Sequence, residues 1–349
     1  MKLKTRCIPF GAYPYESVET ITKMVTKLFE EMPFIPKLPL VDENDTTIKR
    51  TLEGIPGITF VDKNIYLKTT SAQTKKELVQ LDKAYNHPSP ENLERYAFQA
   101  PFLQKYLSII KKFKSKQACI NLVGPFTLSQ IVINNSSEQM LTDKNYRKFF
   151  IQAVVVKALW IIERIHEYNP TTTPVIILEE PVLSKVGILK RETEEITSEL
   201  ITHIFTRVVE KLKSTGAIVG IQCFGKCDWQ IPIDAGVDLI SFDAYNNPNN
   251  LCIIPDKITE FIEKGGMINW AIIPVMTESM IKSMNIDMLY DRLLVTLKWL
   301  VLAGVPEELV YKSALVSLQG DTNHLPLIFA EKASILATQL AKRISLKLR

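Results

Sequence analysis

Short apolar runs alternate with longer segments of helical spacing along most of the chain, which predicts a parallel β-sheet covered by helices. Most of the runs are apolar at consecutive positions, as expected for strands that are buried on both faces. The runs cover residues 6–14, 118–126, 174–182, 217–224, 238–245, 266–275 and 312–320.

Helical spacing fills the intervals between these runs. Apolar side chains recur three or four positions apart in residues 143–167, while residues 192–215 and 284–304 end beside Gly216 and Gly304, which suit helix ends. Because strands and helices alternate, we expect a (β/α)₈ TIM barrel of which one strand escapes detection. An open doubly wound sheet is the alternative, but no Gly-x-Gly-x-x-Gly sequence follows the first run.

Residues 48–113 interrupt this alternation. Two β-like runs on either side of residues 62–64 predict a hairpin, and residues 72–113 predict helices separated by a Pro-containing turn. The interruption lies between the first and second predicted core strands, so we expect it to cover one end of the barrel. The sequence has no linker rich in Gly or Ser and no internal repeat, so residues 1–349 are expected to form one domain.

Composition narrows the class of protein. The formal net charge is +4, with acidic and basic residues interleaved, and no long basic block supports nucleic-acid binding. No apolar run approaches the roughly 20 residues that span a bilayer, and the first residues are a poor signal peptide. The five cysteines are scattered and odd in number, which fits a reducing, cytoplasmic compartment.

Candidate site residues stand at the carboxyl ends of the predicted strands, where barrels place their chemistry. Glu179 and Glu180 end one strand, Asp243 ends another, and His324 follows the last. A carboxylate at the end of an apolar strand is costly to bury unless it is paired or functional. We expect Glu180 and Asp243 to hold a ligand amine or to act as acid and base, with His324 as a further acid or base. The alternatives are that one glutamate caps the next helix or pairs with a buried Lys or Arg, and that His324 lies in a surface loop.

Eight short motifs, in order along nearly the whole chain, resemble those of one barrel superfamily. It contains the catalytic domains of cobalamin-independent methionine synthases and the uroporphyrinogen decarboxylases, and the resemblance is greatest to the short methionine-synthase-like proteins. The motifs are FGAYPY, PFIPKLP, NLVGPFTL, LEEPVLSKVG, VGIQCFGKCDW, SFDAY, INWAIIPV and LVSLQGDTN.

The resemblance implies a zinc site that this chain does not keep. Methyl-transferring members bind zinc through a His-x-Cys, an acid and a final Cys, and the metal converts a substrate thiol into a thiolate. Here Gln222 stands at the histidine, Phe224 at the first cysteine and Gln319 at the last, and only the acid remains, as Asp243. Because zinc needs about four ligands, we expect no metal and no cofactor.

The same resemblance implies that the substrate-binding positions have changed. Ala12 and Tyr15 replace the serine and histidine of the first motif, and Glu179 replaces the aspartate that receives the substrate amine. With Gln222, Phe224 and Gln319, these residues and Trp270 form the predicted substrate-binding set.

Cys223 and Cys227 do not restore the metal site by their spacing. On a strand, Cys223 points away from the side of Gln222 and Phe224, so a metal held by the two cysteines and Asp243 is disfavoured. A redox pair is disfavoured as well, because Cys-x-x-x-Cys lacks the tight spacing of redox motifs.

These observations support a methyltransferase-family barrel that binds a small molecule without catalytic zinc. One alternative is a non-catalytic accessory protein of corrinoid or one-carbon metabolism, with a corrinoid protein as its partner. Another is a metal-free lyase similar to uroporphyrinogen decarboxylase, although the segment GAYPYES has no arginine of the kind that holds porphyrinogen carboxylates.

Overall fold

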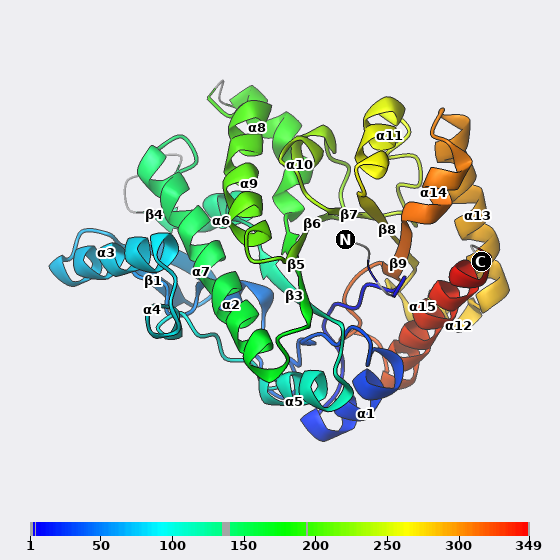
Figure 1. Ribbon diagram of the computed structural model, residues 1–349, viewed down its shortest axis with the longest axis horizontal. Helices are drawn as coiled ribbons and strands as arrows, with labels where there is room; N and C mark the ends of the chain where they lie inside the picture. The colour runs from blue at the N-terminus through cyan, green and yellow to red at the C-terminus, as the bar shows by residue number, and fades with distance from the viewer. Residues whose placement is uncertain (1–2, 4, 135–139, 193–194, 348–349) are drawn as a thin grey trace.

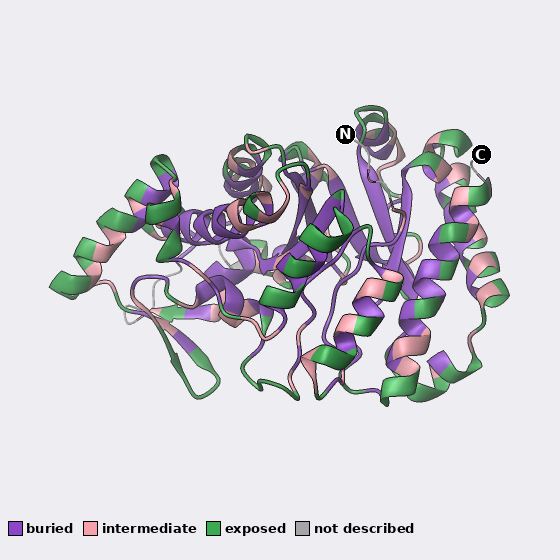
Figure 2. Cartoon of the chain, turned by 60° about the horizontal axis from the view of Figure 1, so that its bottom comes forward, coloured by how far each residue is buried: buried purple, intermediate pink, exposed green. Residues whose placement is uncertain are grey.

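A curled sheet of six parallel strands forms the centre of the computed structural model, which describes residues 3, 5–134, 140–192 and 195–347 (Figure 1). The strand order β3-β5-β6-β7-β8-β9 follows the chain, so each strand adds beside its predecessor. The strands are β3 (Gln117–Val123), β5 (Thr173–Glu179), β6 (Ile218–Cys223), β7 (Leu239–Asp243), β8 (Met267–Ile273) and β9 (Ala314–Leu318). They overlap six of the seven apolar runs, and nearly every residue in them is buried (Figure 2), which confirms the α/β class.

The first apolar run does not form a strand, and the sheet therefore differs from the eight-stranded expectation. Cys7 makes an isolated parallel bridge to Val316 of β9, but the ladder stops there. Pro9 has no amide hydrogen to donate, and Gly11 takes a φ of 110°, which turns the backbone away from an extended course.

A second irregular segment lies along the opposite edge of the sheet. Phe34 makes an isolated bridge to Cys119 of β3, and Lys37 makes one to Ala12 of the first segment. Each edge strand is therefore accompanied by a short irregular segment, and the two segments touch each other. The ring of Phe34 is buried in the core.

A buried ion pair holds the second segment in place. The guanidinium of Arg50 donates to both carboxylate oxygens of Asp45, from Nε at 2.7 Å and from Nη2 at 2.8 Å. It also donates to the carbonyl oxygens of Ile35 and Pro36, both at 2.8 Å, while Asp45 accepts the amide of Leu38 at 2.8 Å. Arg50 and Asp45 are only 4% and 5% exposed. Removing either side chain would leave the charge of the other buried and unpaired, which strongly destabilises a folded protein.

Helices cover the outer face of the sheet. Ser, Thr, Asp or Asn caps many of their amino ends, and the stops predicted at Gly216 and Gly304 follow α9 and α13, where both glycines have positive φ. None of the described helices combines the length and apolar character needed to cross a bilayer. The helices are α1 (Val18–Leu28), α2 (Thr47–Leu52), α3 (Ala72–Asn86), α4 (Pro90–Glu94), α5 (Leu103–Phe113), α6 (Pro125–Ile131), α7 (Lys144–Tyr168), η1 (Pro181–Lys185), α8 (Val186–Glu192), α9 (Ser198–Lys213), α10 (Gln230–Asp234), α11 (Pro255–Glu263), α12 (Glu278–Ser283), α13 (Ile286–Leu302), α14 (Glu307–Ser313) and α15 (Leu327–Lys347).

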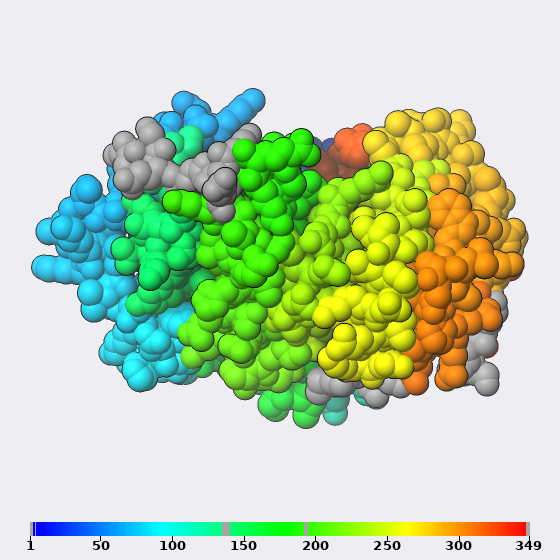
Figure 3. All heavy atoms as spheres, turned by 90° about the horizontal axis from the view of Figure 1, so that it is seen from above, coloured from blue at the N-terminus to red at the C-terminus, as the bar shows by residue number. Residues whose placement is uncertain are grey.

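The hairpin expected before the second run consists of β1 (Ile58–Val61) and β2 (Asn64–Leu67), joined by a turn in which Asp62 has a positive φ. β2 also pairs in parallel with β4 (Val132–Asn134), a strand that the sequence pattern did not predict. In the space-filling view, α3 and α4 lie at one end of the molecule and α13 and α14 at the other (Figure 3).

Replacing Arg50 tests the role of the buried ion pair. Arg50→Met leaves Asp45 buried without a cation and two carbonyl groups without donors, so we expect the free energy of unfolding to fall by about 3–5 kcal/mol in urea titrations. Arg343→Met removes an ion pair whose side chains are 39% and 72% exposed, and should cost no more than about 1 kcal/mol. Equal losses in the two variants would contradict the assigned role.

Candidate functional site

The carboxyl ends of the strands open onto a cavity of about 310 Å³. It contains two predicted site residues, Ala12 and Glu179. The other lining residues are Lys37, Pro39, Asp45, Thr46, Thr47, Ile48, Val123, Thr127, Pro181, Asp321 and Asn323. The irregular segment held by Arg50 thus supplies one wall of the cavity, and the end of β5 supplies another.

Glu179 and Glu180 point to opposite faces of the sheet because side chains alternate along a strand. Glu179 is the last residue of β5, and its Cα pairs with those of Val123 on β3 and Gln222 on β6. It lines the cavity, and one of its carboxylate oxygens accepts a hydrogen bond from Asn121 Nδ2 at 3.1 Å.

Glu180 is fully buried against the first turn of α6. Its carboxylate accepts hydrogen bonds from the amides of Phe126 at 3.0 Å and Thr127 at 2.7 Å, and from the Thr127 hydroxyl at 2.6 Å. Gly124 makes this approach possible, because a Cβ at that position would lie 2.1 Å from the carboxylate. Glu180 therefore satisfies the amino end of α6, an earlier helix, whereas its side chain does not cap η1, the helix that follows it.

Burial raises the pKa of Glu180 to about 7, because the charged carboxylate loses its hydration. The hydrogen bonds from Thr127 and Phe126 act in the opposite direction, since they favour the carboxylate.

The structure brings Asp243 and Gln319 together. Gln319 Nε2 donates to Asp243 Oδ2 at 3.1 Å, and the carboxylate also accepts the amides of Tyr245 and Asn246 and the Asn246 side chain. A carboxylate accepts hydrogen bonds, so it fixes the orientation of the glutamine amide and directs Gln319 Oε1 elsewhere.

Three buried amide oxygens have no hydrogen-bond partner among the described residues. One is Asn269 Oδ1, within β8. The other two are Gln319 Oε1 and Gln222 Oε1, at the carboxyl ends of the strands, in residues that are 6% and 7% exposed. Gln222 lies beside Glu179 in the register of β5 and β6. An unpaired buried acceptor costs about 1–3 kcal/mol, so both oxygens favour a bound group that donates hydrogen bonds.

Gln222, Phe224 and Gln319, which the sequence resemblance places at zinc-ligand positions, do not fit a zinc ion. The ring of Phe224 packs 5.6 Å from that of Phe10, and the Gln319 amide is engaged by Asp243. Within the described ranges, no group of three or more His, Cys, Asp or Glu side chains is placed to hold a metal. The expectation that the protein uses no cofactor stays a prediction.

Sequence reasoning missed Lys37, which lies across the cavity from β5 and pairs with Asp321 at 3.1 Å. Asp321 in turn accepts the amide of Ala12 at 2.8 Å. These contacts join three segments that are far apart in the chain. The only local signal was the extended, proline-rich stretch around Lys37.

The other eight predicted site residues do not line this cavity, and three of them contact other parts of the fold. Tyr15 is buried against α15 and donates its hydroxyl to Glu331 at 2.6 Å. The ring of Trp270 packs 4.9 Å from that of Phe242 and lacks contact with the cavity. His324 is exposed, with Nε2 2.9 Å from the carbonyl oxygen of Val275.

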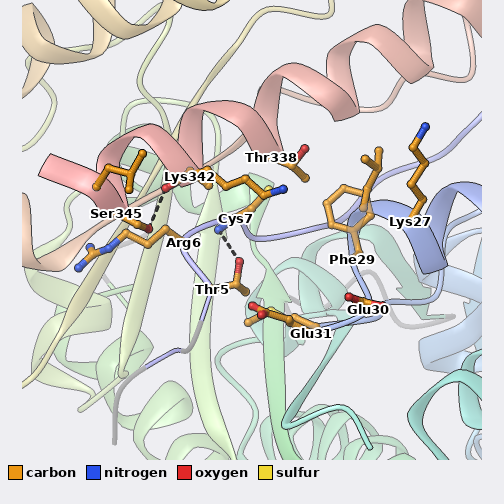
Figure 4. Close-up of a pocket in the computed structure, with 14 residues that line it drawn as sticks. Thr5, Arg6, Cys7, Lys27, Phe29, Glu30, Glu31, Thr338, Lys342 and Ser345 are labelled. Carbon is orange, nitrogen blue, oxygen red and sulfur yellow. Dashed lines mark hydrogen bonds between the residues drawn. The ribbon is translucent and has the colours of Figure 1, made fainter. Parts of the chain in front are cut away.

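A larger cavity of about 520 Å³ lies at the amino ends of the strands (Figure 4). Thr5, Arg6 and Cys7 line it together with residues 27–32 and the end of α15. Arg6 there donates to the carbonyl oxygens of Lys312 and Ala314, and so fixes the start of β9. This cavity lies at the end of the sheet opposite to Glu179 and Asp243, so we assign Arg6 a structural role there.

Comparison of the fold finds a similar solved structure, a B12-independent methionine synthase from Shewanella sp. W3-18-1 in complex with selenomethionine. The TM-score is 0.57 at 11% sequence identity, over 95% of this chain and 89% of that one. The chain therefore shares its overall fold with that structure.

A methyltransferase from Methanosarcina mazei also aligns, with a TM-score of 0.49 and 13% identity over 97% of this chain and 94% of that one. No family model matches the sequence, and no curated protein is significantly similar to it.

The pH dependence of stability tests the buried state of Glu180. Its pKa is about 7 in the folded protein and near 4.5 when unfolded, so the folded state retains a proton that the unfolded state releases in this window. The free energy of unfolding should therefore fall as pH rises from 4.5 to 7, by up to about 3 kcal/mol from this group.

Glu180→Gln should remove this contribution. The stability advantage of the native protein over the variant, measured by urea unfolding, should be smaller at pH 8 than at pH 5. Thr127→Val removes a donor that favours the carboxylate, so it should move the window to higher pH. An identical pH slope in native protein and Glu180→Gln would show that Glu180 does not titrate there.

Proposed function

We propose that this protein is a methionine-synthase-like barrel that binds a small cationic molecule at the carboxyl ends of its strands, with the usual zinc ligands replaced. In this proposal the irregular segments around Cys7 and Phe34 take the places of two strands and complete an eight-membered ring. The bridges from Cys7 to Val316, from Ala12 to Lys37 and from Phe34 to Cys119 support that closure.

One observation carries the proposal: Glu179 is a cavity-lining carboxylate that forms no ion pair among the described residues, and Arg50, the cation that interacts with it electrostatically, is paired with Asp45. The other acids of the cavity are neutralised, because Asp45 pairs with Arg50 and Asp321 pairs with Lys37. The remaining negative charge favours a ligand with an ammonium or similar group.

Hydrogen-bond acceptors at the carboxyl ends of other strands support the same class of ligand. The unpaired oxygens of Gln222 and Gln319 accept hydrogen bonds, and the Asp243 carboxylate accepts them as well. A molecule with several N–H or O–H groups would satisfy these acceptors. Lys37, already paired with Asp321, is the one cation that lines the cavity within the described residues, and it would receive an anionic group of the ligand.

The roles of the site residues follow from this placement. Glu179 binds the cationic group, and Gln222 and Gln319 orient the ligand through their amide oxygens. Glu180 acts as a positioning residue, because it fixes the turn that carries Thr127 into the cavity wall. Phe224 and Phe10 provide an apolar surface in place of a metal.

Calorimetric titration with small amines, with and without a carboxylate, tests the proposal. Glu179→Gln keeps the shape of the side chain but removes its charge, so it should weaken binding of a cationic ligand at least tenfold, or about 1.4 kcal/mol. Glu30→Gln, in the cavity at the other end of the sheet, should leave the Kd unchanged. Binding that responds to Glu30 and not to Glu179 would overturn the proposed site.

A gain of zinc binding tests the assignment of the replaced ligands. The triple variant Gln222→His, Phe224→Cys and Gln319→Cys keeps Asp243 and would supply four zinc ligands of the required types. We expect near-stoichiometric, EDTA-removable zinc in this variant and none in the same variant with Asp243→Ala. A folded triple variant that takes up no zinc would show that the positions are wrongly matched.

A further inference from the structure

A third cavity, of about 390 Å³, lies among α3, α7 and α9, on the outer helices rather than at an end of the sheet (Figure 1). Lys144, Arg147 and Lys148 of α7 line it together with His203 and Arg207 of α9. No Asp or Glu is among the described residues that line it. We call it the basic cavity, because its lining gives it a positive potential.

Helical spacing gathers the cations of the basic cavity. Lys144 and Lys148 are four residues apart on α7, as His203 and Arg207 are on α9, so each helix turns two of these side chains to one face. Like charges that converge from two packed helices repel one another. A bound anion would remove this repulsion, and the basic cavity therefore favours an anionic ligand.

Acidic side chains beside the basic cavity leave it an excess of positive charge. Lys148 pairs with Asp82 at 2.6 Å, and Arg207 lies 4.0 Å from Glu210. Both pairs are exposed, so water and salt screen them. Asp143 accepts two backbone amides as the cap of α7. The other two cations that α7 contributes form no ion pair within the described ranges.

Apolar side chains from all three helices complete the lining. Tyr85 of α3, Ile151 of α7 and Ile204 of α9 are buried and line the basic cavity beside the cations. A further cation, the ammonium of Lys211, lies 5.3 Å from the centroid of the Tyr85 ring. The cavity thus offers both an apolar surface and positive charge, and its volume lies within the range of about 300–1,000 Å³ that is common for small-molecule sites.

We propose that the basic cavity binds a phosphorylated small molecule, with its phosphate oxygens between α7 and α9 and its apolar part on Ile151 and Ile204. N–H groups of arginine and lysine that approach from two helices suit an anion with several acceptor oxygens. Arg147 is already oriented, because its Nη1 donates to the carbonyl oxygen of Leu141 at 2.8 Å. The site is separate from the cavity that contains Glu179, which favours a ligand of the opposite charge.

Calorimetric titrations of the full-length protein at low salt, without divalent cations, test this assignment. The probes are adenosine diphosphate, inorganic pyrophosphate and adenosine. We expect adenosine diphosphate to bind more tightly than pyrophosphate, because it adds an apolar part, and we expect added NaCl to weaken both. Adenosine should not bind measurably. No binding of adenosine diphosphate, or equal binding of adenosine, would overturn the proposal.

Paired variants locate the site. Lys144→Gln combined with Arg207→Gln removes two exposed cations of the basic cavity and should weaken binding of adenosine diphosphate at least tenfold, or about 1.4 kcal/mol. Lys23→Gln combined with Lys298→Gln removes the same net charge from exposed positions on α1 and α13 and should leave the Kd unchanged.

Two outcomes would contradict the site. Equal weakening in both double variants would show that the anion responds to the net charge of the protein rather than to the basic cavity. A single-stranded oligonucleotide that displaces adenosine diphosphate at lower concentration than pyrophosphate does would identify a nucleic-acid surface in place of a small-molecule site.

Discussion

The buried pairing of Arg50 with Asp45 is the interaction on which the candidate site depends. Arg50 holds the carbonyl groups of Ile35 and Pro36, and Asp45 holds the amide of Leu38, so a segment without a regular ladder acquires a fixed course. That course carries Lys37 to its contact with Asp321. A structural ion pair thereby positions a charged residue of the cavity wall.

The alternation of side chains along β5 and β6 separates structural from site roles. Glu179 and Gln222 face inward at the strand ends, whereas Glu180 and Cys223 face the helices. Glu180 consequently accepts the hydrogen bonds of the backbone amides in the first turn of α6. Glu179 and Glu180 are adjacent and identical, but one lines the cavity and the other is buried against a helix, because successive side chains of a strand point to opposite faces.

Sequence reasoning predicted the six sheet strands because their buried runs are continuous, and it predicted helix ends from Gly216 and Gly304. It failed for the first run, where a bridge to Val316 forms without a ladder. It named Asp243 and Gln319, which meet, but also Tyr15, whose hydroxyl is directed to Glu331. Lys37 was not predicted, because its place in the cavity depends on its ion pair with Asp321, a residue far away in the sequence.

The replacements around Asp243 are chemically consistent with one another. Asp243 forms no ion pair within the described part of the chain, so its buried carboxylate must receive hydrogen bonds, or its burial would cost several kcal/mol. Gln319 supplies such a donor, and Asn246 supplies others from its backbone and side chain. In donating its amide hydrogen, Gln319 turns its oxygen away as an unpaired acceptor. The residue that satisfies Asp243 thus creates a requirement for a donor, which a ligand rich in N–H or O–H groups would meet.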